Sequence, residues 1–337
     1  MDAKLEKICE RVADSRTVLI KKMTWEAQPN LVAILCGFIY ASKDKDVDLD
    51  RYLECKKLLK SEVSAFSEFR GIAETMVITK MALSNNPREY LSGAMGVYKK
   101  LRSIHKLTAS PFMVLAAINI YEAGGLERAD ENIEMLENLY KKMNKKHPLL
   151  ISDNDRGFLS MLATSGLDSE KILENTEICY KALSKLSVLN KDGVHALSQI
   201  LALFDKDNER KTEKVFAMRD ALKAVKCPVS KQYGLPGLGA LAMVNKNVDE
   251  IAQDVAEAEQ FFKGKKGFKW YNAGGIEFRR IYAQLAVALR YLPEENSSLG
   301  TNIISTMTVA LIDEIIMLII LLEVEAMSAA RSNSSAS

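Results

Sequence analysis

The chain has 337 residues, with 46 basic and 44 acidic side chains, so its formal net charge is only +2. This balance excludes a positive field over the whole protein, of the kind that binds nucleic acid indiscriminately, so any electrostatic function depends on how the charges are arranged. Hydrophobic residues make up 48% of the chain, which has only 7 prolines and 17 glycines. So few breakers favour helices over a turn-rich β fold, and the length is enough to bury a core without disulfides or metals.

The N-terminal stretch 1–16 is charged and has a helical pattern, without the apolar core of a signal peptide. The cysteines are odd in number and none lies in a CxxC pair, which indicates neither a disulfide framework nor a zinc site. They are Cys9, Cys36, Cys55, Cys179 and Cys227. Both observations predict a protein of the reducing cytoplasm. After the first helix, the apolar stretch 29–40 and the amphipathic stretch 48–63 predict a second helix and its partner.

From residue 81 onward, a large aliphatic residue followed by alanine recurs inside short apolar segments. The pairs are Met81-Ala82, Leu115-Ala116, Leu162-Ala163, Leu201-Ala202, Leu241-Ala242 and Leu285-Ala286. Their intervals of about 34 to 47 residues are typical of two-helix repeat units. Each such segment predicts a buried helix, in which alanine lets a neighbouring helix approach closely.

An amphipathic stretch follows each apolar segment. In 129–143, for example, Ile133, Leu136 and Leu139 fall on one helical face. Similar stretches are 90–104, 169–186, 209–225 and 248–262, and no segment alternates as a strand does. The sequence therefore predicts an all-α fold, an elongated αα-hairpin repeat array covering residues 1–292.

The order of several motifs resembles an uncharacterised bacterial family, the domain of unknown function 4003. The motifs are FSEFRG, SPFMVLAA, KKHPLLISDNDRGFLSMLA, YGLPGLGALA and KGFKWYNAGGIEFRRIYAQLAVAL. The resemblance covers roughly residues 30–292, and the last motif is its most specific part. It implies a helical bacterial protein of the cytoplasm, and it brings no activity, substrate or site residue with it.

The C-terminal part has a different composition. We expect a linker at 293–300, an apolar helix at 301–327 and a disordered tail at 328–337. The run 303–322 has the length of a membrane span, but Asp313 and Glu314 lie in its middle. A buried helix or an oligomer contact is therefore favoured, with peripheral membrane association as the alternative.

Lysines gather where the second helix of each predicted unit ends, and acids gather where it begins. This polarity is favourable to the helix macrodipole, so stability alone explains it. In an open array the same polarity predicts a basic edge opposite an acidic one. The candidate partner-binding residues at that edge are Lys141, Lys142, Lys145, Lys146, Lys263, Lys265, Lys266, Lys269 and Trp270.

No arrangement of residues indicates a catalytic site, a metal or a cofactor. The phosphate-binding loop, HExxH, GxSxG and GxGxxG patterns are all missing. Of the three histidines, His105 and His147 are expected near helix ends and in loops, and His195 in the core of a buried helix.

The function that these patterns favour is a non-enzymatic scaffold, which binds a protein or peptide through the lysine-rich edge. A nucleic-acid-binding protein that uses the same edge is the first alternative, because aromatic residues accompany the lysines at 261–275. An unrecognised enzyme is the second alternative. A large pocket with two or more convergent ionisable groups would favour it.

Overall fold

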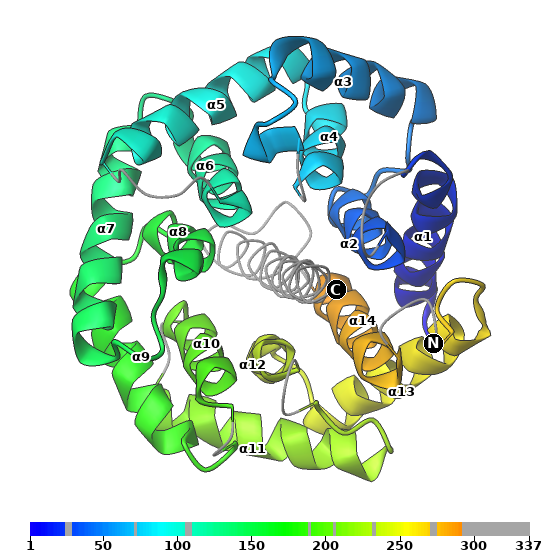
Figure 1. Ribbon diagram of the computed structural model, residues 1–337. Helices are drawn as coiled ribbons and strands as arrows, with labels where there is room; N and C mark the ends of the chain where they lie inside the picture. Colours follow the sequence, from blue (N-terminus) through cyan, green and yellow to red (C-terminus); the bar gives the residue numbers. More distant parts are fainter. Residues whose placement is uncertain are drawn as a thin grey trace, which may run out of the picture.

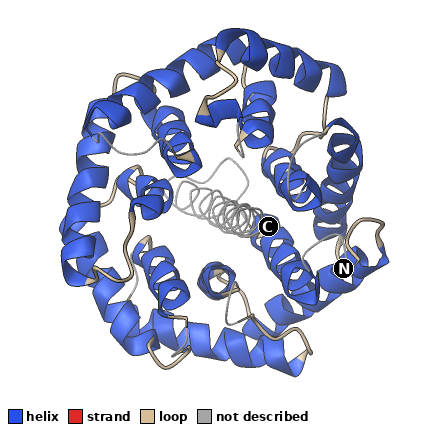
Figure 2. Cartoon of the chain, viewed as in Figure 1, coloured by secondary structure: helices blue, strands red, loops and turns tan. Residues whose placement is uncertain are grey.

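The computed structural model describes residues 1–23, 29–70, 73–104, 110–187, 190–204, 207–230, 234–269 and 275–291. Fourteen α-helices and three short 3-10 helices make up the regular structure of this part, and it contains no strand (Figure 2). The predicted all-α fold is confirmed. The predicted linker, apolar helix and tail at 293–337 lie outside the described residues.

The helices form two layers around a common axis (Figure 1). The outer layer consists of α1 (Ala3–Leu19), α3 (Leu49–Glu62), α5 (Pro87–Ile104), α7 (Ala129–Lys146), α9 (Ser169–Leu183), α11 (Asn208–Ala224) and α13 (Val248–Gly264). The inner layer consists of α2 (Pro29–Ser42), α4 (Glu74–Leu83), α6 (Pro111–Gly124), α8 (Arg156–Ala163), α10 (Lys191–Ala202), α12 (Leu235–Met243) and α14 (Gly275–Arg290). Short 3-10 helices lie at Ile20–Lys22, Glu68–Arg70 and Asp153–Asp155.

The inner helices are the apolar segments of the sequence. All six aliphatic–alanine pairs lie in them, one pair in each helix from α4 to α14. In α6 every residue from Pro111 to Ile120 is buried, as expected of a helix that is hydrophobic on all sides. The predicted alternation of a buried helix and an amphipathic helix is confirmed.

The outer helices are amphipathic, and polar side chains fix where many of the helices begin. On α7, Ile133, Leu136, Leu139 and Met143 are buried while the opposite face is charged. At eight helix starts in the described part of the chain, a side-chain oxygen accepts a hydrogen bond from a backbone N–H of the first turn, which satisfies one of the free donors there. The capping residues are Asp2, Asp48, Asn86, Ser110, Asp168, Asn190, Asp207 and Asn247.

The seven hairpins close into a ring, because α1 packs against both α13 and α14 (Figure 1). Arg290 Nε, at the end of α14, donates a 2.6 Å hydrogen bond to Asp2 Oδ2. Asn30 Nδ2 donates to the carbonyl oxygen of Gly267 at 2.8 Å, across 237 positions of the chain. The array is therefore not elongated as predicted, since contacts between its first and last hairpins leave it no open ends.

An aromatic cluster fills the junction between these hairpins. Phe268 is fully buried and stacks on Phe262, with ring centroids 4.8 Å apart. Tyr282 of α14 meets Phe268 edge-on at 6.0 Å and lies 6.2 Å from Phe38 of α2. Phe268 thus seats the last inner helix, whereas Trp270 lies outside the described residues.

The two ends of the ring differ in their connections. Short segments such as 84–86 and 125–128 join each inner helix to the next outer helix. Longer segments join each outer helix to its inner partner, as 147–155 does after α7. The short connections after α2, α4 and α6 lie at one end of the ring, because residues at the C-terminal ends of these three helices line one pocket.

Candidate functional site

The predicted lysine edge is divided between two distant parts of the ring. Four of its lysines belong to α7 and four to the end of α13 and the segment after it, and these two helices lie on opposite sides of the ring (Figure 1). Trp270 lies outside the described residues. Lys141, Lys145, Lys146, Lys263, Lys266 and Lys269 are exposed. Lys265 lies with its Nζ 4.4 Å from the centroid of the Phe261 ring.

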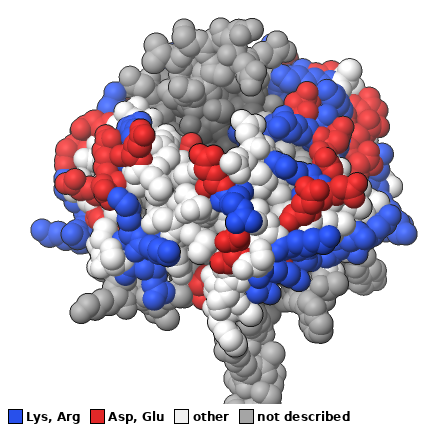
Figure 3. All heavy atoms as spheres, turned by 90° about the horizontal axis from the view of Figure 1, so that it is seen from above, with Lys and Arg blue, Asp and Glu red and all other residues white. Residues whose placement is uncertain are grey.

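Two ion pairs between neighbouring outer helices run against the expected separation into a basic and an acidic edge. Lys142, near the end of α7, forms an ion pair with Glu170 in the first turn of α9. Lys100, near the end of α5, pairs in the same way with Asp130 of α7 at 2.6 Å. At these two junctions the end of one outer helix lies beside the start of the next, and both signs of charge occur on the face seen in Figure 3.

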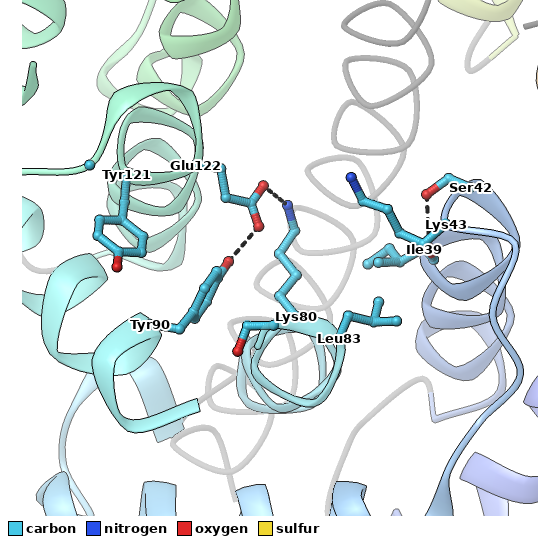
Figure 4. A pocket seen from close by; sticks show the side chains of 10 residues that line it. Ile39, Ser42, Lys43, Lys80, Leu83, Tyr90, Tyr121 and Glu122 are labelled. Carbon is cyan, nitrogen blue, oxygen red and sulfur yellow. Dashed lines mark hydrogen bonds and ion pairs between the residues drawn. The ribbon is translucent and has the colours of Figure 1, made fainter. Parts of the chain in front are cut away.

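A pocket of about 500 Å³ opens where the C-terminal ends of α2, α4 and α6 come together. Its wall combines apolar and polar side chains (Figure 4). The lining residues are Ile39, Ser42, Lys43, Lys80, Leu83, Ser84, Tyr90, Tyr121, Glu122 and Gly125. The volume lies within the range of small-molecule sites, which is about 300–1,000 Å³.

The polar centre of the pocket is the Glu122 carboxylate. Lys80 Nζ, from α4, donates to Glu122 Oε2 at 2.9 Å, and Tyr90 Oη, from α5, donates to Oε1 at 2.5 Å. The Lys80 and Tyr90 side chains are more than nine-tenths buried, whereas 37% of the Glu122 side chain is exposed. A carboxylate has about four acceptor positions, so Glu122 retains acceptor capacity toward the pocket.

The surroundings of Glu122 hold it ionised. Burial raises its pKa, but the charge of Lys80, the hydrogen bonds from Tyr90 and Lys80, and the charge of Lys43 outweigh this and lower the pKa below its usual value. Glu122 therefore acts as an acceptor at neutral pH. The Lys43 side chain is exposed and extends toward the same space (Figure 4).

Two glycines shape the wall beside Glu122. A Cβ at Gly93 of α5 would lie 2.0 Å from the Tyr121 ring, so only glycine lets that ring approach α5. Gly125 ends α6 with φ of 63°, a left-handed conformation that favours glycine. The rings of Tyr121 and Tyr90 meet edge-on at 5.6 Å.

Sequence reasoning missed this pocket, although a signal was present. Lys80 stands alone in the apolar segment MVITKMAL, and Glu122 follows the apolar run of α6. A single charge in a helix that is otherwise buried needs a partner, because an unpaired buried charge is costly. Two such residues in neighbouring inner helices could have been paired on that ground.

Histidines form a second group of titratable residues. The rings of His147, Tyr180 and His195 lie 5.2 to 5.4 Å apart, and His147 Nε2 is 2.8 Å from Glu177 Oε2. His195 is 4% exposed, which confirms the predicted core histidine; His147 follows α7 directly, and His105 lies outside the described residues. In the described part of the chain, no group of three or more histidines, cysteines or carboxylates could hold a metal ion.

The fold and the pocket define a class of protein: a closed ring of seven helical hairpins with a polar pocket at one end. The sequence matches the family described as "Protein of unknown function (DUF4003)" over residues 17–317. The chain belongs to this family, as its motifs indicated.

The chain is also similar to one bacterial protein of curated sequence. The chain is 22% identical over 257 residues to the uncharacterized protein YeaA of Bacillus subtilis (strain 168), which covers 74% of this chain and 75% of that protein. No solved structure matches the chain. Among the described helices, none combines the length and the hydrophobicity that crossing a bilayer requires, and the apolar run 303–322 lies outside the described residues.

Proposed function

We propose that the protein binds a small polar molecule in the pocket between α2, α4 and α6. The observation that carries the proposal is the Glu122 carboxylate, which two deeply buried donors fix in place while part of it faces the pocket. Polar groups that converge in a concave, partly apolar site are typical of ligand-binding sites.

A purely structural ion pair looks different in this ring. Arg279 of α14 pairs with Glu259 of α13 at 2.5 Å, and both side chains are more than nine-tenths buried. That pair joins an inner helix to its own outer helix. The Lys80–Glu122 pair joins two inner helices and leaves its acid partly open, which supports a role beyond packing.

Binding can be tested by thermal unfolding in the presence of a library of small polar metabolites. A bound ligand at 100 times its Kd adds about 2.7 kcal/mol of stability, so the Tm of the protein should rise by a few degrees. Leu83→Trp should abolish the rise by filling the pocket, and Glu122→Gln should weaken it. Glu259→Gln is the matched control: it breaks a buried pair elsewhere in the ring and should keep the ligand response.

The proposal fails if no compound in the library shifts the Tm. It also fails if the Leu83→Trp variant responds to the same ligands as the wild-type protein does. Tyr90→Phe, which removes only one hydroxyl, gives a second measurement if Glu122→Gln does not fold.

Protein or peptide binding by the lysines of α7 and α13 stays a prediction, and so does nucleic-acid binding. A pocket lined by Lys142, Lys145 and Lys146 lies between α7 and α9, but Lys142 is engaged there with Glu170. We therefore favour a small molecule over these partners. A cytoplasmic location is also a proposal, supported by five buried cysteines that are all free thiols.

A further inference from the structure

The pocket presents both signs of charge to a ligand. Glu122 is ionised and keeps acceptor capacity, as described above. Lys43, at the end of α2, forms no ion pair with any described residue, although Asp44 and Asp46 follow it closely. Both of these acids are engaged by Arg11 of α1.

The charges on the wall nearly cancel. Lys80 and Lys43 are positive and Glu122 is negative, while the C-terminal ends of α2, α4 and α6 each add a partial negative charge of about one half. A ligand with a single negative charge would be repelled by Glu122. A ligand with a single positive charge would be repelled by Lys43 and Lys80. In either case one group of the pocket would lose water without gaining a partner.

We infer that the pocket binds a free amino acid, whose ammonium group contacts Glu122 and whose carboxylate contacts Lys43. Glu122 and Lys43 are near enough for the lysine charge to act on the carboxylate, but they form no ion pair with each other. Both side chains line the same pocket, where a zwitterion would bond to each of them. This inference rests on the proposed function of the pocket.

The rest of the wall fits the side chain of such a ligand. Ile39 and Leu83 supply an apolar surface, and the Tyr121 ring lies on the opposite side of Glu122 from Lys80 (Figure 4). The Ser42 and Ser84 hydroxyls donate to carbonyl oxygens of their own helices. They therefore offer little to a polar side chain, and we expect an aliphatic or aromatic amino acid to bind most tightly.

The test is calorimetry of the full-length protein with each of the twenty common amino acids. The tightest binder is then compared with its decarboxylated amine and its deaminated acid, and with glucose and myo-inositol as neutral polyols. Losing either charge of the ligand should weaken binding at least about ten-fold, because hydrogen bonds between charged groups are the stronger ones.

Two variants test the contacts of the ligand carboxylate and of the ligand ammonium group separately. Lys43→Gln should weaken binding of the amino acid about ten-fold and leave binding of the amine unchanged, since the amine has no group for that lysine. Glu122→Gln should weaken the amino acid and the amine while leaving the deaminated acid unaffected or tighter. Lys43→Arg, which keeps the charge, should retain binding.

The inference is overturned if no amino acid binds at millimolar concentration, or if a neutral polyol or a singly charged analogue binds as tightly. These outcomes leave the proposed function intact when another metabolite still binds and Leu83→Trp abolishes its effect. If no metabolite binds at all, both fail.

Discussion

His195 makes the stability of the ring depend on pH. Its imidazole lies on α10 and is 4% exposed, with His147 and Tyr180 packed edge-on against it. Burial lowers the pKa of His195 to about 4; the charge of His147 lowers it too, and Glu177 opposes this. In the unfolded chain a histidine has a pKa of about 6.5.

The direction of the effect follows from these two values. Below pH 6.5 the unfolded chain takes up a proton at His195 while the folded protein keeps the imidazole neutral. The contribution of the neutral His195 to the free energy of unfolding is therefore fully present above pH 6.5, and it is lost as the pH drops toward 4. One pKa unit corresponds to about 1.4 kcal/mol, so the loss amounts to roughly 3 kcal/mol at pH 4.

His195→Phe keeps a ring at this position and removes the proton site. Urea unfolding of the variant and the wild type between pH 7 and pH 4 gives the difference in their free energies of unfolding, in which the titration of other groups largely cancels. We expect this difference to shift in favour of the variant by roughly 3 kcal/mol over that range.

Cys179→Ala is the matched control. It also alters a fully buried residue of α9, and burial raises the pKa of that thiol, so it does not titrate in this range. Its difference from the wild type should be independent of pH. A difference curve for His195→Phe as flat as this control would refute the reasoning.

Three further predictions concern closure of the ring, the pocket wall and the surface charges. Asn30→Ala removes the bond to the carbonyl oxygen of Gly267 and should cost about 1–3 kcal/mol in urea unfolding. Gly93→Ala should displace the Tyr121 ring, lower the Tm and weaken ligand binding in the pocket; an unchanged Tm would contradict the close approach. Lys142→Ala breaks an exposed ion pair and should change the free energy of unfolding by less than about 1 kcal/mol. A larger loss would mean that this pair fixes neighbouring outer helices together.

Much of the fold could be predicted from the sequence because it is encoded locally. The spacing of apolar residues marked the inner and outer helices, and the recurrent alanines marked the inner ones. Closure could not be predicted in this way, since it depends on the small rotation from each hairpin to the next, added over all seven. Contacts such as Asn30 with Gly267 become visible only when that sum is known.

The candidate site shows the same division between local and long-range information. Lys80 and Glu122 are each unusual within their own helix, and the sequence therefore held a hint of both. Their pairing spans 42 positions and two inner helices, so no local pattern reveals it. Tyr90 adds a third helix, and its hydroxyl is assigned to Glu122 only by the packing of α5 beside α6.

The lysines show that one local rule is compatible with two different distributions of surface charge. Acids at helix starts and lysines at helix ends stabilise each outer helix through its macrodipole, whatever the arrangement of the helices. Helices standing side by side at equal height would place all the lysines on one edge. In this ring the end of one helix meets the start of the next, as Lys100 meets Asp130, so the same charges pair between hairpins. The polarity that suggested a docking edge thus brings opposite charges together between hairpins. Glu122 is an ionised carboxylate that stays partly open, and it lies in the pocket.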